Sequence, residues 1–499
     1  MKRLTILLLI VIATAHIAVA KPKSPSLWVG SLKVEQMNSP MGIDARHPRL
    51  SWVIGSTLND VRQTAYEIIV ASSAEKLAKD EGDIWSSGKV ESDSSVLVGY
   101  KGAPLKSNQR CYWKVRVYTT KGNTQWSAPS MWSMGLLTEN DWTSRWIGLD
   151  RAMGWESETQ WSRLAARYLR KEFKLKEGKT MKQATLHICG LGMYEAFING
   201  QKVGDRVLNP MPTDYRRTVL YNSYDVTGLL KQSNAIGVTL GNGRFYTMRQ
   251  NYKPYKITNF GYPKMRLMLI VEYSDGTTER IGSDERWKLF CKGPILSNNE
   301  YDGEDYDANR EMPGWSEPGF DDKEWMKAQR VSIPYGTLRA SMAPGMKVME
   351  QIKPQRVFKA RRGNGYIIDM GQNMAGWLKI KVQSAAKGDT IRLRFAETLQ
   401  KDSSLYIANL RDAKCTDTYV ANGKEKGREW SPTFVYHGFR FVEVTGLKYA
   451  PQAADFTGEV IYDEMNIIGN FACDNDVLNQ IYKNAFWGIR SNYKGMTVD

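Results

Sequence analysis

The 499-residue sequence predicts a mainly β protein made of consecutive β-sandwiches, with a helix at the C-terminus. Apolar and polar residues alternate at period two in many short runs, and clusters of Gly, Asn, Asp and Ser separate these runs. A convincing apolar pattern of helical spacing begins only after residue 470. Hydrophobic residues make up 42% of the chain and charged residues 24%, which excludes a disordered, collagen-like or polytopic membrane protein.

The N-terminus has the pattern of a secretory signal. Lys2 and Arg3 precede an apolar run over 4–13, and the small residues of 18–20 follow it. About 15 apolar residues are too few to span a bilayer, which takes ~20. We therefore expect residues 1–20 to be a signal peptide, the protein to be periplasmic or extracellular, and no segment to span the membrane.

The charge and the cysteines indicate no special partner. The formal net charge is +16, two charges of which lie in the signal segment, and no Lys/Arg block exceeds three residues. Because an exported chain rarely meets nucleic acid, we expect no nucleic-acid partner. The five Cys are scattered without CxxC spacing, so neither a zinc site nor a disulfide scaffold is indicated, and a single disulfide is left open.

Residues 25–145 are predicted to form a fibronectin- or immunoglobulin-like sandwich. The runs 66–71 and 111–118 alternate at period two, and Trp113 is a candidate core residue.

Residues 146–335 and 338–463 are predicted to form two jelly-roll-like sandwiches. In the first, 186–190 and 194–198 are expected to pair as strands, and Asn199-Gly200 and Asp275-Gly276 are hairpin turns. In the second, the strand runs are 366–369, 378–382 and 391–395.

Residues 464–499 are predicted to begin an α-helical domain. Asp474 or Asn475 is the expected N-cap, and apolar residues recur at helical spacing. They are Leu478, Ile481, Tyr482, Ala485 and Ile489. The preceding β units offer this face no obvious partner, so we expect the chain from Phe471 onward to be poorly ordered or prone to aggregate.

Several strings carry a family resemblance when they are taken in order. They are FINGQKVG at 197–204, PTDY at 212–215, YDVT at 224–227, LGNG at 240–243, GEDYDA at 303–308, DMGQNMAGW at 369–377, AETL at 396–399 and PTFVYHGFR at 432–440. The ordered set closely resembles the non-catalytic N-terminal half of bacterial α-L-rhamnosidases of glycoside hydrolase family 78. It covers nearly all of residues 30–499.

The resemblance implies an enzyme that hydrolyses terminal α-L-rhamnose with inversion, using a general acid and a general base ~6.5–9.5 Å apart. In that family both residues lie in a downstream (α/α)6 barrel, whose first helix resembles 471–493 here. Asp499 resembles the residue that opens the family's Asp-Cys-Pro-Gln-Arg-Asp-Glu-Arg run. The resemblance therefore implies no catalytic residue within this chain, an inactive 499-residue fragment, no required cofactor, and two partners: a rhamnose-containing saccharide and the missing catalytic domain.

Acidic and aromatic residues in three stretches of the chain are candidates for sugar binding. Carboxylates accept hydrogen bonds from sugar hydroxyls, and aromatic rings pack on the C–H faces of sugars. The candidates are Asp214, Tyr215, Glu304, Asp305, Asp307 and Trp377. For Asp214 the alternative is an Asx turn. For the acidic cluster of Asp302, Glu304, Asp305 and Asp307 it is a loop held by ion pairs with Arg310, and for Trp377 it is a turn that docks on the barrel. His437 is expected to be a structural or interface residue rather than a catalytic one.

A calcium ion near Asp214 or Asp305 is left open. The family includes members with a calcium-dependent rhamnose-binding module in the second unit. The spacing Asp305-x-Asp307-x-Asn309 imitates the start of an EF-hand, but Arg310 and Ser316 occupy positions that need Gly and Glu, so an EF-hand is rejected.

Two other functions compete with the enzyme. Aromatic richness without an acid/base pair would also suit a stand-alone carbohydrate-binding protein. An adhesin or scaffold of fibronectin-like modules ranks last, because the later units do not repeat the first.

Overall fold

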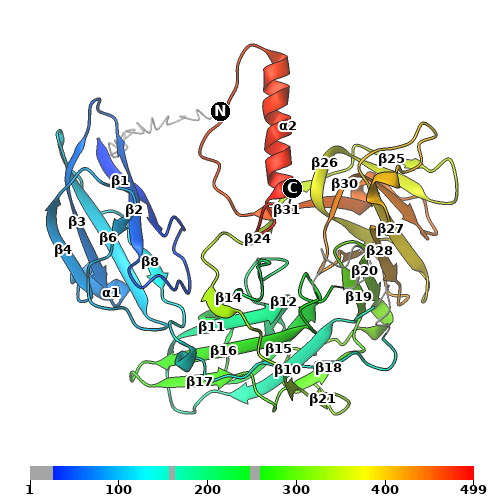
Figure 1. The fold of residues 1–499 in the computed structure, drawn as a ribbon, viewed down its shortest axis with the longest axis horizontal. Coiled ribbons are helices and arrows are strands. Elements are labelled where there is room, and N and C mark those ends of the chain that lie inside the picture. Colours follow the sequence, from blue (N-terminus) through cyan, green and yellow to red (C-terminus); the bar gives the residue numbers. More distant parts are fainter. Residues whose placement is uncertain (1–25, 157–162, 248–258, 499) are drawn as a thin grey trace, which may run out of the picture. The chain divides into compact units, whose positions relative to one another are not determined.

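The computed structural model describes residues 26–156, 163–247 and 259–498, and it is mainly β, as predicted (Figure 1). These residues form two compact units. Unit 1 contains residues up to Lys33 together with 49–102 and 112–130; unit 2 contains 34–48, 103–111 and the residues from Met131 onward. The predicted signal peptide and Asp499 lie outside the described residues.

Unit 1 is built on two antiparallel sheets, as expected for an immunoglobulin-like sandwich. One sheet has the order β1 (Leu27–Val34), β2 (Arg49–Ser56), β5 (Val98–Gly99); the other has β4 (Trp85–Glu91), β3 (Gln63–Ala71), β6 (Arg110–Thr119), β7 (Gly122–Asn123), with the short helix α1 (Ala74–Ala78) after β3. The chain passes from unit 1 into unit 2 at β8 (Ser130–Ser133). Trp52 and Trp113 are buried between the sheets, and the Trp52 indole donates to Gln63 Oε1 at 3.0 Å.

The first sandwich of unit 2 packs two sheets face to face. The first sheet has the order β13 (Gln201–Lys202), β12 (Met193–Ile198), β15 (Ser233–Gly241), β10 (Arg167–Lys174), β18 (Lys288–Phe290), β21 (Met326–Lys327). The second has β22 (Gln329–Arg330), β9 (Ile147–Gly148), β16 (Lys264–Tyr273), β11 (Met181–Leu191), β14 (Thr218–Asp225), β23 (Thr337–Ala340), with β17 (Thr278–Gly282) on β16. The 3₁₀ turns η1 (Glu139–Asp141) and η2 (Thr227–Leu229) lie in connections. Side chains such as Leu186, Val238 and Leu267 fill the space between the sheets.

Both predicted hairpins are confirmed, and one predicted strand pair is wrong. Asn199 and Gly200 have φ of 51° and 81°, as a type I′ turn requires, and join β12 to β13. Asp275-Gly276 lies in the turn between β16 and β17. However, 186–190 and 194–198 do not pair, because β11 and β12 belong to opposite sheets. Period-two alternation identifies a strand but not its partner.

The second sandwich is one sheet that folds over at a long strand. The order is β19 (Ile295–Asn299), β20 (Gly303–Asp307), β28 (Thr416–Val420), β27 (Thr390–Ala396), β30 (His437–Thr445), β26 (Tyr366–Val382), β31 (Phe456–Asp463), β24 (Met346–Ile352), with β25 (Arg356–Lys359) and β29 (Arg428–Trp430) also on β26. The 3₁₀ turns are η3 (Ala308–Arg310), η4 (Ala408–Leu410) and η5 (Ala453–Asp455). β26 pairs with β30 up to Gly376 and with β31 from Gly376 onward, so this strand contributes to both layers. The core includes Leu378, Leu393, Phe395, Tyr419 and Phe439.

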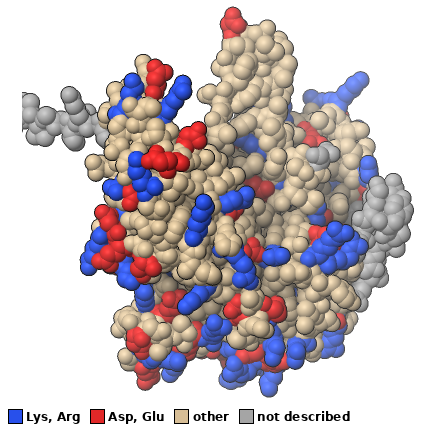
Figure 2. Space-filling view, turned by 60° about the vertical axis from the view of Figure 1, so that its left-hand side comes forward, with Lys and Arg blue, Asp and Glu red and all other residues tan. Residues whose placement is uncertain are grey.

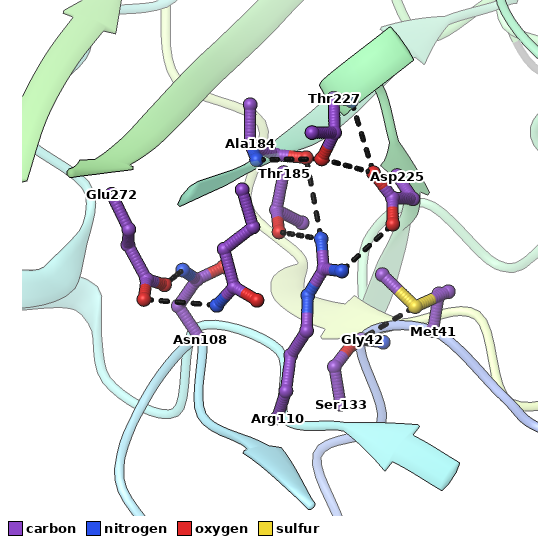
Figure 3. A network of polar contacts seen from close by, with 11 residues as sticks. Met41, Gly42, Asn108, Arg110, Ser133, Ala184, Thr185, Asp225, Thr227 and Glu272 are labelled. Atoms are coloured by element: carbon purple, nitrogen blue, oxygen red, sulfur yellow. Dashed lines mark hydrogen bonds and ion pairs between the residues drawn. The ribbon is translucent and has the colours of Figure 1, made fainter. Parts of the chain in front are cut away.

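Segment 103–111 is fixed to the first sandwich of unit 2 by charged and amide groups (Figure 3). Arg110 lies 2.7 Å from Asp225 Oδ2, and the Asn108 side chain donates to Glu272 Oε1 at 2.8 Å. The Arg110 side chain is only 8% exposed, whereas that of Asp225 is 45% exposed, so the ion pair lies at the edge of the buried region. The segment therefore belongs structurally to unit 2, although it lies early in the chain.

The predicted C-terminal helix is present as α2 (Asp476–Asn492), and Asn475 is its N-cap. Asn475 Oδ1 accepts from the backbone N–H of Val477 and Leu478 at 3.0 and 3.2 Å. None of the helices in the described part of the chain is long and apolar enough to cross a membrane.

Candidate functional site

The six sugar-binding candidates lie in separate parts of unit 2. Asp214 and Tyr215 are in the loop before β14, the three acidic residues are on β20, and Trp377 is on β26. Only the β20 residues are close together, and the alternation of the strand turns neighbouring side chains to opposite faces.

Asp214 is exposed and is bound by its neighbours. Its Oδ1 accepts from the Arg216 backbone N–H at 3.2 Å and from Arg216 Nε at 2.9 Å, and this hydrogen bonding lowers the pKa of the carboxyl. Tyr215 is buried against Phe245 and Phe260, with ring centroids 5.3 and 5.1 Å away. The Asx-turn interpretation of Asp214 agrees with this geometry, and sugar binding at this loop stays a prediction.

Trp377 is a core residue, 4% exposed. Its indole N–H donates to Glu459 Oε2 at 2.6 Å, and Glu459 also lies 2.8 Å from Lys379 Nζ. The ring packs with Phe434 and Ile461, so it supports the junction of β26 and β31.

The acidic residues of β20 have three different environments. Glu304 is completely buried, Asp305 is partly exposed on the outer face, and Asp307 caps η3 by accepting from the Asn309 N–H at 3.0 Å. Asp307 also lies 3.3 Å from Arg310, which confirms the predicted ion pair. Asp305 Oδ2 accepts from Ser297 Oγ at 3.0 Å and lies 3.5 Å from Arg163.

A buried polar network links three strands, β20, β28 and β30, and the loops that carry Cys415 and Phe434. His437 Nε2 lies 3.0 Å from Asp417 Oδ1, and His437 Nδ1 lies 3.4 Å from Cys415 Sγ. Asp417 Oδ1 also accepts from the Glu304 backbone N–H at 3.0 Å. The Glu304 carboxyl accepts from the backbone N–H of Phe434 at 3.0 Å.

The protonation of this network follows from its burial. Loss of solvent raises the pKa of Glu304 to about 8, which keeps most of this carboxyl protonated at neutral pH. Burial opposes the positive charge of His437, but the neighbouring Asp417 and Cys415 outweigh it and raise its pKa to about 10. His437 is therefore an imidazolium paired with the Asp417 carboxylate.

Perturbed pKa values often mark reactive sites, but this network is closed. His437 and Asp417 are at most 2% exposed, and the Phe395 ring stacks on the imidazole at 4.1 Å. The expectation that His437 is structural therefore agrees with its position. Asp417 was not among the predicted residues; its one signal is a lone carboxylate in the alternating run 416–420, at a position where an apolar residue belongs.

The described residues give little support to a metal site. They contain no group of three or more His, Cys, Asp or Glu side chains that could hold a metal ion, and all five Cys are free thiols. Near Asp214 lie Arg216 and Arg217, and Arg163 lies beside Asp305, so both carboxylates are already paired with cations. These donors do not fit a calcium ion well, and calcium binding stays a prediction.

Models of protein families match the chain in four consecutive segments. They are the Rha78A-like N-terminal immunoglobulin domain (29–138), the alpha-L-rhamnosidase N-terminal domain (179–350), the bacterial alpha-L-rhamnosidase concanavalin-like domain (359–462) and the bacterial alpha-L-rhamnosidase 6 hairpin glycosidase domain (466–499). This chain belongs to the bacterial α-L-rhamnosidases. It matches their N-terminal part.

Known α-L-rhamnosidases resemble the chain over nearly its whole length. One from Formosa agariphila is 35% identical over 95% of this chain and 52% of its own length. The structure of the enzyme from Dictyoglumus thermophilum has a TM-score of 0.86 at 36% identity, over 93% of this chain and 52% of that one. The Streptomyces avermitilis enzyme complexed with L-rhamnose has a TM-score of 0.85 at 29% identity, over 95% and 61%. The chain thus spans about half the length of the α-L-rhamnosidases it matches.

Within this rhamnosidase fold, α2 presents an apolar side to solvent. No residue of the helix is fully buried, and Val477 and Ile481 are 68% and 57% exposed. In Figure 2 the projection at the top, which is α2 with the segment before it, carries few charged side chains. The helix is held at its C-terminal end, where Arg490 lies 2.6 Å from Glu350 of β24.

Proposed function

We propose that this chain is the non-catalytic N-terminal part of an exported, inverting α-L-rhamnosidase, and that the full enzyme releases terminal α-L-rhamnose from rhamnosides or plant polysaccharides. The order of the four matched family segments supports this proposal most directly. Export rests on the signal pattern of residues 1–20.

The exposed side of α2 supports a helical domain as the partner of this part. The segment 466–499 matches the 6 hairpin glycosidase domain, and solvent-exposed apolar residues on a helix mark a surface that normally packs against something else. We infer that further helices of the same enzyme cover the α2 side that carries Ile481 and supply the general acid and base.

The role of the sandwiches in this proposal is mechanical. Glu304 and Asp417, two of the buried acidic residues, lie inside a closed network and cannot reach a glycosidic oxygen. The sandwiches would hold the first helix of the catalytic domain in place and present saccharide to it, while the chemistry occurs elsewhere.

The test is hydrolysis of p-nitrophenyl α-L-rhamnoside by the purified 499-residue chain. We expect no turnover above a buffer control. A longer protein from the same reading frame, extending through the matched glycosidase domain, should release p-nitrophenol and give β-L-rhamnose first, as NMR of the fresh product would record. Turnover by the 499-residue chain, or a stop codon directly after Asp499 in the gene, would refute the proposal.

A further inference from the structure

A groove runs over the outer face of the second sandwich, on the side of β20 opposite to Glu304. It has a cavity of about 430 Å³ formed by β19, β20, β28, β27 and β30, which lie side by side in the sheet (Figure 1). A second cavity of about 680 Å³ adjoins it, and the exposed Arg163 lines both. Both volumes lie in the range of ~300–1,000 Å³ that is usual for small-molecule sites.

The floor of the first cavity is polar because of strand register. Arg392 and Arg394 alternate with the buried Leu393 on β27. Arg392 lies opposite Thr418 on one side and Thr445 on the other, and Thr418 in turn lies opposite Asp305. With strands ~4.8 Å apart, this row of side chains crosses about 14 Å of sheet.

Arg394 on β27 has a buried hydrogen-bond donor without an acceptor in the described part of the chain. Arg394 Nε is buried and has no hydrogen-bond partner among the described residues, and neither Arg392 nor Arg394 forms an ion pair with a residue of the described ranges. Asp305, by contrast, is engaged by Ser297 and Arg163. A buried guanidinium donor without an acceptor is costly, and an anionic oxygen would satisfy it.

The rest of the lining suits a saccharide. Thr416, Thr418 and Thr445 offer hydroxyls, and Asn299 offers an amide; such groups exchange hydrogen bonds with sugar hydroxyls. Asp302 and Glu443, the latter opposite Arg394 in the register, add carboxylates that accept from sugar hydroxyls, and Lys414 adds a further cation. The first cavity has no aromatic side chain in its lining, but the second contains Trp155, which is 53% exposed with Lys292 Nζ 4.7 Å above its ring. A flat exposed indole is a surface on which a sugar ring packs.

We propose that this groove is a binding site for an acidic oligosaccharide, with a uronate carboxylate on Arg392 and Arg394 and a further sugar reaching past Arg163 to Trp155. The planar guanidinium forks match a carboxylate in two parallel charge-assisted hydrogen bonds, which are about twice as strong as the neutral hydrogen bonds that sugar hydroxyls accept. The site is a binding site only, and it stands whether or not the protein hydrolyses rhamnosides.

Isothermal titration calorimetry of the full 499-residue chain tests this. The probes are a tetramer of α-1,4-linked galacturonate, its fully methyl-esterified form, and a sulfated neutral tetrasaccharide. We expect the acid to bind at least ~10-fold more tightly than the ester, because the ester lacks the charge that the arginines recognise. Raising the salt from 20 to ~200 mM should weaken the acid several-fold.

Variants locate the site. Arg392→Gln and Arg394→Gln should each weaken the acid ~10-fold or more and leave the ester unchanged. Trp155→Ala should weaken the tetramer several-fold but leave a single galacturonate unaffected. Arg362→Gln, which removes a charge from an 81% exposed arginine outside the groove, is the matched control and should change nothing.

Arg392 is exposed, so its variant tests the site even if the Arg394 variant fails to fold. Equal affinity for acid and ester, no binding of the acid at 10 mM, or equal losses in the Arg392 and Arg362 variants would each overturn the proposal. Tighter binding of the sulfated probe would overturn the assignment of a carboxylate.

Discussion

The two faces of the sheet around β20 and β27 are both rich in charged residues, but they are organised in opposite ways. On the inner face, Glu304, Asp417 and His437 are buried and bind one another or the backbone. On the outer face, Arg392 and Arg394 line a groove, and the buried Arg394 Nε has no hydrogen-bond partner among the described residues. A perturbed pKa alone therefore does not identify a functional site: the groups with strongly shifted pKa values lie in the closed inner network, whereas Arg392 in the outer groove is exposed to solvent.

The largest effect should come from opening the inner network. Asp417→Asn removes the counter-charge of the buried His437, and loss of one partner of a buried ion pair costs about 3–5 kcal/mol. The measurement is the thermal unfolding of the second sandwich by calorimetry. On the outer face, Asp305→Asn should cost less than about 1 kcal/mol, because a partly exposed pair contributes little. Equal losses at the two positions would contradict the contrast between the faces.

The second prediction concerns the pH dependence of stability, which should reflect the buried groups of the inner face. In the folded protein Glu304 and His437 keep protons up to pH about 8 and about 10, whereas their ordinary pKa values are 4.5 and 6.5. Between those limits the unfolded chain binds fewer protons, so stability falls as pH rises. The stability from His437 is complete below pH 6.5 and is lost through pH 10. We expect a lower Tm at pH 9 than at pH 6 and a flatter profile in His437→Gln; a higher Tm at pH 9 would refute this.

Aromatic residues give a third contrast. Trp377→Phe loses the hydrogen bond to Glu459 and some packing, with an expected cost of about 1–3 kcal/mol. The matched variant on the outer groove, Trp155→Phe, should stay within about 0.5 kcal/mol, since surface substitutions rarely do more. Urea unfolding followed by far-UV circular dichroism compares them. Should Trp155→Phe prove the more damaging, Trp155 would be a structural residue.

The smallest effect is expected at Asp214. Its partners Arg216 and Arg217 are both exposed, so Asp214→Asn should not change the Tm measurably. Calorimetry with L-rhamnose, with and without calcium, gives the second readout: a sugar heat that disappears in this variant would establish the loop as a binding site. A Tm loss of several degrees would show that the loop carries more of the fold than its contacts indicate.

Much of the fold could be predicted from the sequence because its signals are local. Asn199-Gly200 fixes a two-residue hairpin, and the N-cap and apolar spacing fix α2. Pairing is not local: β11 and β12 are separated by one residue but lie in different sheets, and β20 joins β28, more than 100 residues later. No periodicity in either strand specifies such partners.

The candidate sites were harder to predict for the same reason. Glu304 and Asp305 are neighbours with similar chemistry, and only the pleat of β20 decides that one is buried and the other lines a groove. The sequence pattern around Arg392 and Arg394 does not predict a site, because alternating arginines are typical of any solvated strand face. Their importance depends on what lies opposite them in the register, which is a property of the assembled sheet.

The contacts that attach α2 determine the orientation of this helix. The helix is fastened at its C-terminal end, where Arg490 lies against Glu350 and the Gly495 N–H lies 2.8 Å from both carboxylate oxygens of Asp463. From that anchor its 17 residues extend for about 25 Å. In Figure 1 the helix projects away from β31. The orientation of a domain packed along α2 would be set by the contacts at the C-terminal end of the helix. A small rotation of the helix at Asp463 would therefore move its N-terminal end by several times the distance that its C-terminal end moves.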